Sequence, residues 1–180
     1  EIVAEQAYSE GDTDFRAQLT AIKSTNPQVI FVPGYYTEAA LIIKQARELN
    51  MNMVFIGGDG WDSAKLLEIG GESMNGCFFT NHYAADDTSA IVQDFVKKYI
   101  ARYNETPDAM AVLGYDATNI VIDAIKRAGS TEGAKIRDAL ATTVDYQGVS
   151  GKITIDENRN ARKSVVIIAI KNQKLKYHET

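Results

Sequence analysis

Three short hydrophobic runs recur at an even interval in the first half of the chain. They centre on Ile30, Val54 and Phe78, 24 residues apart each time, and each is continuously apolar. Continuous runs bounded by turn residues are typical of strands buried on both faces of a parallel sheet. Residues 2–8 are less hydrophobic and are expected to add one more strand, nearer an edge. The three central strands are expected over 29–32, 53–56 and 77–79.

Helical periodicity fills the intervals between these runs. Phe15, Leu19 and Ile22 lie on one face of a first helix, for which Asp12 or Thr13 is the candidate N-cap. Strands that alternate with helices over such short connections indicate right-handed crossovers and an α/β fold. The next two helices are expected over 37–49 and 63–69.

The pattern changes after Thr80, where helical segments follow one another without a strand between them. Asp108 is the expected N-cap of the longest helix and Gly129 its stop, and Ser130 or Thr131 begins the next. An alternating strand and a fully apolar strand follow, and then a turn and a polar tail. These helices are expected over 89–103, 108–128 and 131–142, and these strands over 152–156 and 165–170.

Composition excludes several classes of protein. The 180 residues are 45% hydrophobic and 24% charged, which are globular values. The longest aliphatic run, 165–170, is far below the roughly 20 residues of a membrane helix. A net charge of −5 without a basic cluster disfavours nucleic acid, so no nucleic-acid partner is expected. The first residues carry neither a basic region nor an apolar core, so no signal peptide is expected within the chain.

Recognisable catalytic and metal-binding motifs are scarce. One cysteine, Cys77, and two histidines exclude an internal disulfide framework and cysteine-based zinc sites. Cys77 lies inside an apolar run and is interpreted as a small buried hydrophobe. The chain has no nucleophile elbow, zinc-protease motif or phosphate loop. We therefore expect no enzymatic activity, no metal and no cofactor.

Two segments directly after expected strands carry candidate binding chemistry, because ligands of open α/β sheets bind at the carboxyl ends of the strands. In the first, 33–37, Tyr35 and Tyr36 can present a hydroxyl and a flat apolar face, although packing of one of them at the edge of the core is an equal alternative. In the second, 57–63, glycines let the backbone approach a ligand, and Asp59 can bond a cationic group. Trp61 can form a wall of the same site. The alternative for this segment is a glycine-rich turn with Asp62 or Ser63 as a helix N-cap.

An ordered set of short motifs along nearly the whole chain resembles one protein family, the periplasmic substrate-binding proteins of branched-chain amino-acid ABC transporters. These are the leucine/isoleucine/valine-binding proteins of the type I periplasmic binding fold. The matching stretches are Gly34-Tyr-Tyr-Thr-Glu-Ala, Lys44-Gln-Ala-Arg47, Phe55-Ile-Gly-Gly-Asp-Gly60, Ile69-Gly-Gly-Glu72, Pro107-Asp-Ala109, Gly114-Tyr-Asp-Ala117 and Gly151-Lys-Ile-Thr-Ile-Asp156.

The resemblance implies a fold and a site. Its fold has two α/β lobes, each with a flavodoxin- or Rossmann-like three-layer parallel sheet, which close on an amino acid. Asp59, where the family often has Glu, would bind the α-ammonium, and Tyr35 would contact the ligand backbone. Met110 falls where the family often has an aromatic residue in the side-chain pocket. The implied role is extracytoplasmic, periplasmic or at the cell surface, and delivers the amino acid to the membrane permease of an ABC transporter.

The resemblance covers only the carboxyl-terminal half of the family's length. Residues 1–81 and 164–180 would form one lobe that lacks its first strand and helix, and 82–163 would be the returning segment of the other lobe. The chain is therefore expected to be a fragment or half of a binding protein. Exposed apolar surface on the second segment would favour association with the missing amino-terminal half or with itself.

Two other functions compete with transport. A ligand-sensing receptor domain of the same fold would use the same site and signal instead of delivering its ligand. A small α/β enzyme would use Asp59 as a base or a metal ligand, but the sequence offers no partner base or nucleophile. The sequence leaves open which amino acid or related molecule is bound.

Overall fold

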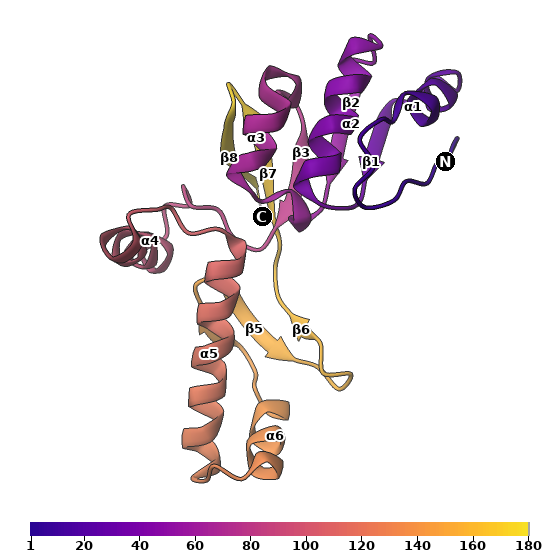
Figure 1. Cartoon of the computed structure of the whole chain (residues 1–180). Coiled ribbons are helices and arrows are strands. Elements are labelled where there is room, and N and C mark those ends of the chain that lie inside the picture. Colours follow the sequence, from indigo (N-terminus) through magenta and orange to yellow (C-terminus); the bar gives the residue numbers. More distant parts are fainter. Residues whose placement is uncertain (180) are drawn as a thin grey trace. The chain divides into compact units, whose positions relative to one another are not determined.

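The computed structural model describes residues 1–179, which divide into two compact units (Figure 1). Unit 1 comprises Glu1–Asn81 and Ile167–Glu179, and unit 2 comprises His82–Val166. The chain thus leaves unit 1 once, after its third strand, and returns to it for the last two. Unit 2 ends at Val166, three residues after the end at 163 that the sequence suggests.

Unit 1 is built on a five-stranded sheet. The first three strands pair in parallel, with Val29 opposite Val54 and Ile56 opposite Phe78, while the last two pair antiparallel. The order in the sheet is β1-β2-β3-β7-β8. The expected parallel α/β architecture is confirmed. The strands are β1 (Val29–Val32), β2 (Val54–Gly57), β3 (Phe78–Asn81), β7 (Val166–Lys171) and β8 (Lys174–Glu179).

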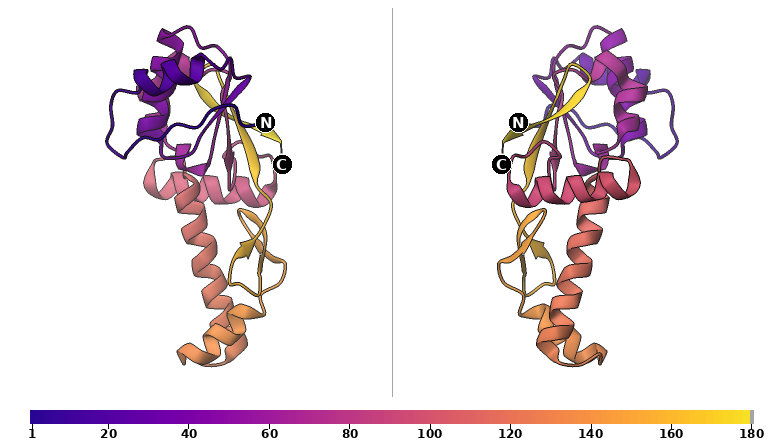
Figure 2. Two further views of the ribbon diagram at one scale, coloured as in Figure 1. Left: turned by 90° about the vertical axis from the view of Figure 1, so that its right-hand side faces the viewer. Right: turned by 90° about the vertical axis from the view of Figure 1, so that its left-hand side faces the viewer.

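Three α-helices lie against one face of this sheet (Figure 2). They bury the inward residues of the first strands, and Ser63 caps the third helix by accepting a hydrogen bond from the Lys65 amide, as expected. Phe15, at the N-cap of the first helix, makes no side-chain cap, so the predicted Asp12 or Thr13 cap is wrong. The helices are α1 (Arg16–Lys23), α2 (Tyr36–Glu48) and α3 (Ala64–Gly70), with short 3₁₀ turns η1 (Asp59–Trp61) and η2 (Gly71–Met74).

Strands β1 and β2 are not buried on both faces, so that expectation is wrong for them. Ile30 and Val32 are buried, whereas Val29 and Phe31 between them are 47% and 65% exposed. Val54 on the neighbouring strand is 37% exposed. The reason is that α1–α3 cover one face only, and no helix among residues 1–179 of unit 1 covers the other.

Two segments of unit 1 differ from the sequence prediction. Residues 2–8 form neither a helix nor a strand; the Tyr8 hydroxyl links them to the loop after β1 by donating to the Pro33 carbonyl at 2.6 Å. The polar tail, in contrast, forms strand β8. Asn172 and Gln173 have φ of 51° and 54°, the left-handed backbone of a tight hairpin turn. That turn lets the polar tail pair with β7, which hydrophobicity alone does not indicate.

Unit 2 combines three helices with a small antiparallel sheet, β4-β5-β6. Its core contains Tyr83, Val92, Val96, Val112 and Val149. The helices are α4 (Ala90–Tyr103), α5 (Ala109–Ala128) and α6 (Gly133–Ala141), and the strands are β4 (Tyr146–Gly148), β5 (Gly151–Ile155) and β6 (Ala161–Arg162).

The ends of the long helix α5 are where the sequence places them. The Asp108 carboxylate accepts a hydrogen bond from the Ala111 amide at 2.8 Å, and Gly129 has φ of 58° after the last turn. The N-cap of α6 is Glu132 rather than Ser130 or Thr131. None of the helices within residues 1–179 is both long and apolar enough to cross a bilayer.

Candidate functional site

The candidate site of unit 1 consists of two loops that leave neighbouring strands at the same edge of the sheet. Val32, the last residue of β1, lies opposite Gly57, the last residue of β2. Parallel pairing in this register places the loops 33–35 and 58–62 side by side at the carboxyl edge. This is the edge at which open α/β sheets bind ligands.

Close backbone packing brings the two loops into contact. A Cβ atom added to Gly60 would lie 2.5 Å from the Gly34 carbonyl oxygen and 3.2 Å from Cδ1 of Tyr35. Gly34 itself has φ of 129°, and the Tyr8 hydroxyl lies where its Cβ would be. Glycine is therefore favoured at position 34 by the backbone conformation and required at position 60 by the lack of space.

The structure places Tyr35 and Asp59 in the two neighbouring loops at this edge. Tyr35 is the N-cap residue of α2, and its side chain is 69% exposed beside Gly60. Asp59, directly before Gly60, is the first residue of η1 and is also exposed. The pair thus offers an aromatic ring, a hydroxyl and a carboxylate on one open surface, a combination suited to a small cationic or zwitterionic molecule.

A shallow groove runs beside Tyr35. It has a volume of about 390 Å³ and is lined by residues of the amino-terminal segment and of the loop after β1. Glu38 in its wall is buried and accepts a hydrogen bond from the Gly11 amide at 3.0 Å. Burial, reinforced by the charge of Glu38, raises the pKa of Tyr8, so the Tyr8 hydroxyl stays protonated and donates to Pro33.

Trp61 lies beneath the site rather than at its surface. Its side chain is completely buried, its ring occupies the space where a Cβ of Gly57 would lie, and it packs against Phe79 at 6.1 Å between ring centroids. The expectation that Trp61 forms a wall of the open site is therefore wrong. Instead, Trp61 supports the loop that carries Asp59 from below. Its indole Nε1 has no hydrogen-bond partner within the described residues.

We expect Trp61→Ala to lower the free energy of unfolding of unit 1 by about 3–5 kcal/mol, because it empties a large buried volume. Trp61→Phe keeps most of the ring and removes an unpartnered buried N–H, so it is expected to cost less than half as much. Denaturant unfolding followed by circular dichroism measures both. Equal losses for the two variants would mean that Nε1 has a partner that matters.

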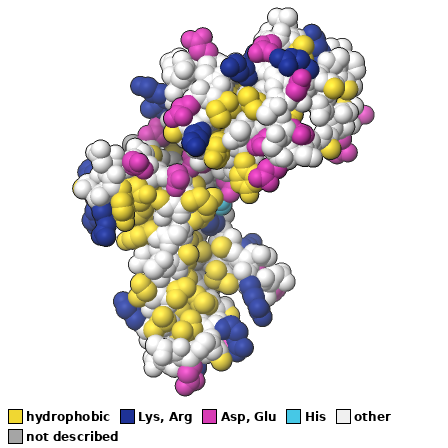
Figure 3. Space-filling model, in the orientation of Figure 1, with side chains coloured by type: hydrophobic (Ala, Val, Ile, Leu, Met, Phe, Trp, Pro, Cys, Tyr) yellow, Lys and Arg dark blue, Asp and Glu magenta, His cyan; other side chains and the backbone are white. Residues whose placement is uncertain are grey.

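The fourth predicted site residue, Met110, belongs to unit 2. It is the second residue of α5 and is 60% exposed. Figure 3 shows hydrophobic side chains gathered over α5, and the large ones of this helix that are at least two-fifths exposed are Met110, Tyr115, Val121 and Ile122. Met110 thus lies on an exposed part of α5, and its place in a side-chain pocket stays a prediction.

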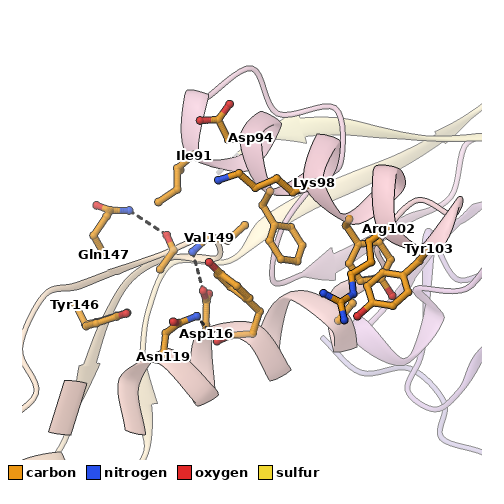
Figure 4. Close-up of a pocket in the computed structure, with 15 residues that line it drawn as sticks. Ile91, Asp94, Lys98, Arg102, Tyr103, Asp116, Asn119, Tyr146, Gln147 and Val149 are labelled. Atoms are coloured by element: carbon orange, nitrogen blue, oxygen red, sulfur yellow. Dashed lines mark hydrogen bonds between the residues drawn. The ribbon is translucent and has the colours of Figure 1, made fainter. Parts of the chain in front are cut away.

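Unit 2 also contains an open groove of about 600 Å³ between α4, α5 and β4 (Figure 4). Phe95 is among its lining residues, with its ring centroid 4.9 Å from Tyr115 and 5.8 Å from Tyr99. Lys98 and Arg102 lie along the α4 side. Sequence periodicity predicts that the aromatic residues of α4 lie along one face of that helix. It does not predict that this face remains exposed.

Asp116 is a buried acid that the sequence analysis did not single out. It is 2% exposed, and its carboxylate accepts hydrogen bonds from the Val149 amide at 2.8 Å, the Ser150 amide at 2.9 Å and the Ser150 hydroxyl at 2.7 Å. It thereby holds the turn between β4 and β5 against α5. The sequence does contain a signal for the burial of Asp116, because Asp116 lies one helical turn from both Val112 and Ile120 on the buried face of α5.

Cys77 is buried, as the sequence predicts. Burial raises the pKa of its thiol, and the Arg47 guanidinium, 3.8 Å from Sγ, only opposes that shift. A thiol in these surroundings is poorly reactive. Within residues 1–179 no group of three metal-ligating side chains is assembled.

Comparisons with known proteins agree with this architecture. The family described as "Periplasmic binding protein" matches residues 1–174. The Leu/Ile/Val-binding protein BraC3 of Rhizobium johnstonii is 32% identical over 86% of this chain and 42% of its own length.

Solved structures match over a similar span. The leucine binding protein LivK of Thermotoga maritima superposes with a TM-score of 0.89 at 42% identity, covering 95% of this chain and 49% of that one. The branched-chain amino acid transporter substrate binding protein LivJ of Streptococcus pneumoniae, solved in complex with isoleucine, gives a TM-score of 0.84 at 32% identity, covering 96% and 51%. The chain spans about half the length of the relatives it matches, and it belongs to the periplasmic binding protein family.

Proposed function

We propose that this chain supplies half of a site that binds a free amino acid, branched-chain or similar in size, without catalysis. The observation that carries the proposal is the contact between the two strand-end loops, which puts Tyr35 and Asp59 on one exposed edge of the unit 1 sheet. Relatives named for binding leucine, isoleucine and valine support this choice of ligand.

Each side chain has a distinct role in the proposed site. The Asp59 carboxylate holds the α-ammonium through a charge-assisted hydrogen bond, and the Tyr35 ring packs against the ligand backbone. Asp is one methylene shorter than Glu, so it draws the ammonium nearer to the sheet edge than Glu would. Trp61 acts indirectly by fixing the η1 turn from below.

The rest of the proposed mechanism requires a second lobe. Closure of two lobes around the ligand would exclude water from the Asp59–ammonium contact and strengthen it, and contacts made only in the closed state would drive the closure. We assign residues 82–163 to that second lobe, with Met110 in its side-chain pocket. The missing amino-terminal half, or self-association, would complete it.

The biological role follows from the family. We infer an extracytoplasmic protein, periplasmic or at the cell surface, that delivers its amino acid to the membrane permease of an ABC transporter. Neither a cofactor nor a metal takes part in this binding.

Calorimetric titration of a completed protein tests the proposal. In that protein, residues 1–180 follow the amino-terminal half of the Thermotoga maritima leucine binding protein, which is 42% identical to this chain over the matched part. Free leucine, isoleucine and valine are titrated beside their N-acetyl forms, which lack the ammonium charge that Asp59 is proposed to bind.

A further inference from the structure

The amino-terminal segment is bonded to the chain on both sides of the loop that follows β1. Before the loop, the Tyr8 hydroxyl donates a hydrogen bond to the Pro33 carbonyl at 2.6 Å. After the loop, in the first turn of α2, the Glu38 carboxylate accepts one from the Gly11 amide at 3.0 Å. Tyr35 lies between these two attachment points. The amino-terminal segment therefore fixes the backbone on either side of the residue that is proposed to pack against the ligand.

Tyr8 is itself held by the hydrophobic core of unit 1. Its ring packs edge-on against Phe15, with 5.6 Å between the ring centroids and 89° between the ring planes. Phe15 is 1% exposed, and its amide donates a hydrogen bond to the side chain of Gln45 on α2 at 2.8 Å. The position of the Tyr8 hydroxyl is therefore set by the core and by α2, and not by the loop to which it is bonded.

The contacts of Tyr8 continue through two glycines to the loop that carries Asp59. The Tyr8 hydroxyl lies 2.1 Å from where a Cβ of Gly34 would be, so it packs directly against the Gly34 backbone. The Gly34 carbonyl oxygen in turn lies 2.5 Å from where a Cβ of Gly60 would be. Gly60 follows Asp59 in the chain. One hydroxyl group is thus connected, through backbone contacts, to both strand-end loops.

Tyr35 has little support of its own. Its side chain is 69% exposed and, within the described part of the chain, makes no capping hydrogen bond to α2. The backbone before it is unusual as well, because Gly34 has φ of 129°, a conformation that glycine adopts without preferring it to others. The position of the Tyr35 ring therefore depends on what holds the backbone of its loop in this conformation.

We propose that Tyr8 is a positioning residue of the amino-acid site, whose hydroxyl acts through Pro33 and Gly34 to set the place of Tyr35 relative to Asp59. Binding groups need to be held within about 0.5 Å of their productive geometry by such supporting side chains. The inference rests on the proposed function for its ligand. The arrangement of the two loops, however, can be measured without any ligand.

Calorimetric titration of the completed protein defined above tests the effect on binding, with whichever of leucine, isoleucine and valine the wild type binds most tightly. Tyr8→Phe keeps the ring and removes only the donor, so we expect about five- to tenfold weaker binding, the usual contribution of one hydrogen bond. Para-aminophenylalanine at position 8 keeps the ring and again places a donor opposite Pro33. It should restore most of the affinity.

Arg47→Met is the control for a general loss of stability in unit 1. Arg47 donates hydrogen bonds to the carbonyls of Met51 and Met53, which precede β2 and so lie at the opposite edge of the sheet from the site. Its replacement leaves backbone carbonyls without donors, and it should destabilise the unit. The affinity for the amino acid should remain unchanged in this variant.

Amide resonances of the 180-residue chain without ligand provide the second readout. In proton–nitrogen correlation spectra, Tyr8→Phe should shift the signals of Tyr35 and Gly60, which lie in different loops. Para-aminophenylalanine at position 8 should return both signals towards their wild-type positions, and Arg47→Met should move neither. A tyrosine that only stabilised its own segment would leave the Gly60 signal in place.

Three outcomes would overturn the inference. One is an unchanged Tyr35 or Gly60 signal in Tyr8→Phe, whatever happens to the affinity. Another is an equal loss of affinity in Tyr8→Phe and Arg47→Met, which would indicate general destabilisation. The third is a loss of affinity that para-aminophenylalanine does not restore. If both signals shift as expected but the completed protein binds none of the three amino acids, the positioning of the loops by Tyr8 is upheld and the proposed function is contradicted.

Discussion

Asp59→Ala in the completed protein is expected to weaken amino-acid binding by about 2–5 kcal/mol, the usual loss when one member of a buried charge pair is removed. The ammonium of the ligand would remain in a closed cleft without its counter-charge. Isothermal titration of wild type and variant with the same amino acid measures the loss. Asp59 is exposed in unit 1, so the free energy of unfolding should change by less than about 0.5 kcal/mol.

The matched control for this variant is Glu68→Gln. Glu68 is an exposed acid on α3, outside the two strand-end loops, and its substitution removes the same negative charge from unit 1. Affinity should be unchanged in that control. Equal losses in both variants would indicate a general effect of charge, and unchanged affinity in Asp59→Ala would remove Asp59 from the site.

Asp116→Ala is expected to destabilise unit 2 by about 3–5 kcal/mol, because it leaves buried hydrogen-bond donors without an acceptor. The donors are the amides of Val149 and Ser150 and the Ser150 hydroxyl. Gly148 packs against the same carboxylate so closely that its Cβ would lie 2.6 Å from Oδ2. The loss should therefore release the whole turn between β4 and β5.

Denaturant unfolding gives the size of this effect, and hydrogen exchange of 146–155 gives its location. Asp123→Ala, on the exposed side of the same helix, removes an ion pair with Arg127 at 2.7 Å and is expected to cost about 0–1 kcal/mol. Asp116→Asn, which keeps one acceptor oxygen, should fall between the two. An Asp116→Ala variant as stable as Asp123→Ala would show that the turn holds without the carboxylate.

Much of the fold follows from local pattern. The apolar runs around Ile30, Val54 and Phe78 predict the parallel strands, and Asp108 and Gly129 mark the ends of α5 correctly. These elements are predictable because burial and capping act over a few residues. The strand β8 was missed because its residues are polar, and its pairing depends on the turn at Asn172 and Gln173.

The remaining errors concern packing, which a single sequence does not specify. The apolar run around Phe31 predicts that this side chain is buried, but the face of the sheet on which it lies is exposed. Trp61 stands two residues from Asp59 in the chain, but its ring turns inward under Gly57. Whether Tyr35 and Asp59 meet depends on the register of β1 against β2, which only the structure gives.

The titration of the completed protein with leucine, isoleucine and valine and with their N-acetyl forms tests the central claim most directly. The account predicts saturable binding of at least one free amino acid and no detectable binding of its N-acetyl form, which has no ammonium for Asp59. Equal binding of both forms, or no binding of any free amino acid, would contradict it.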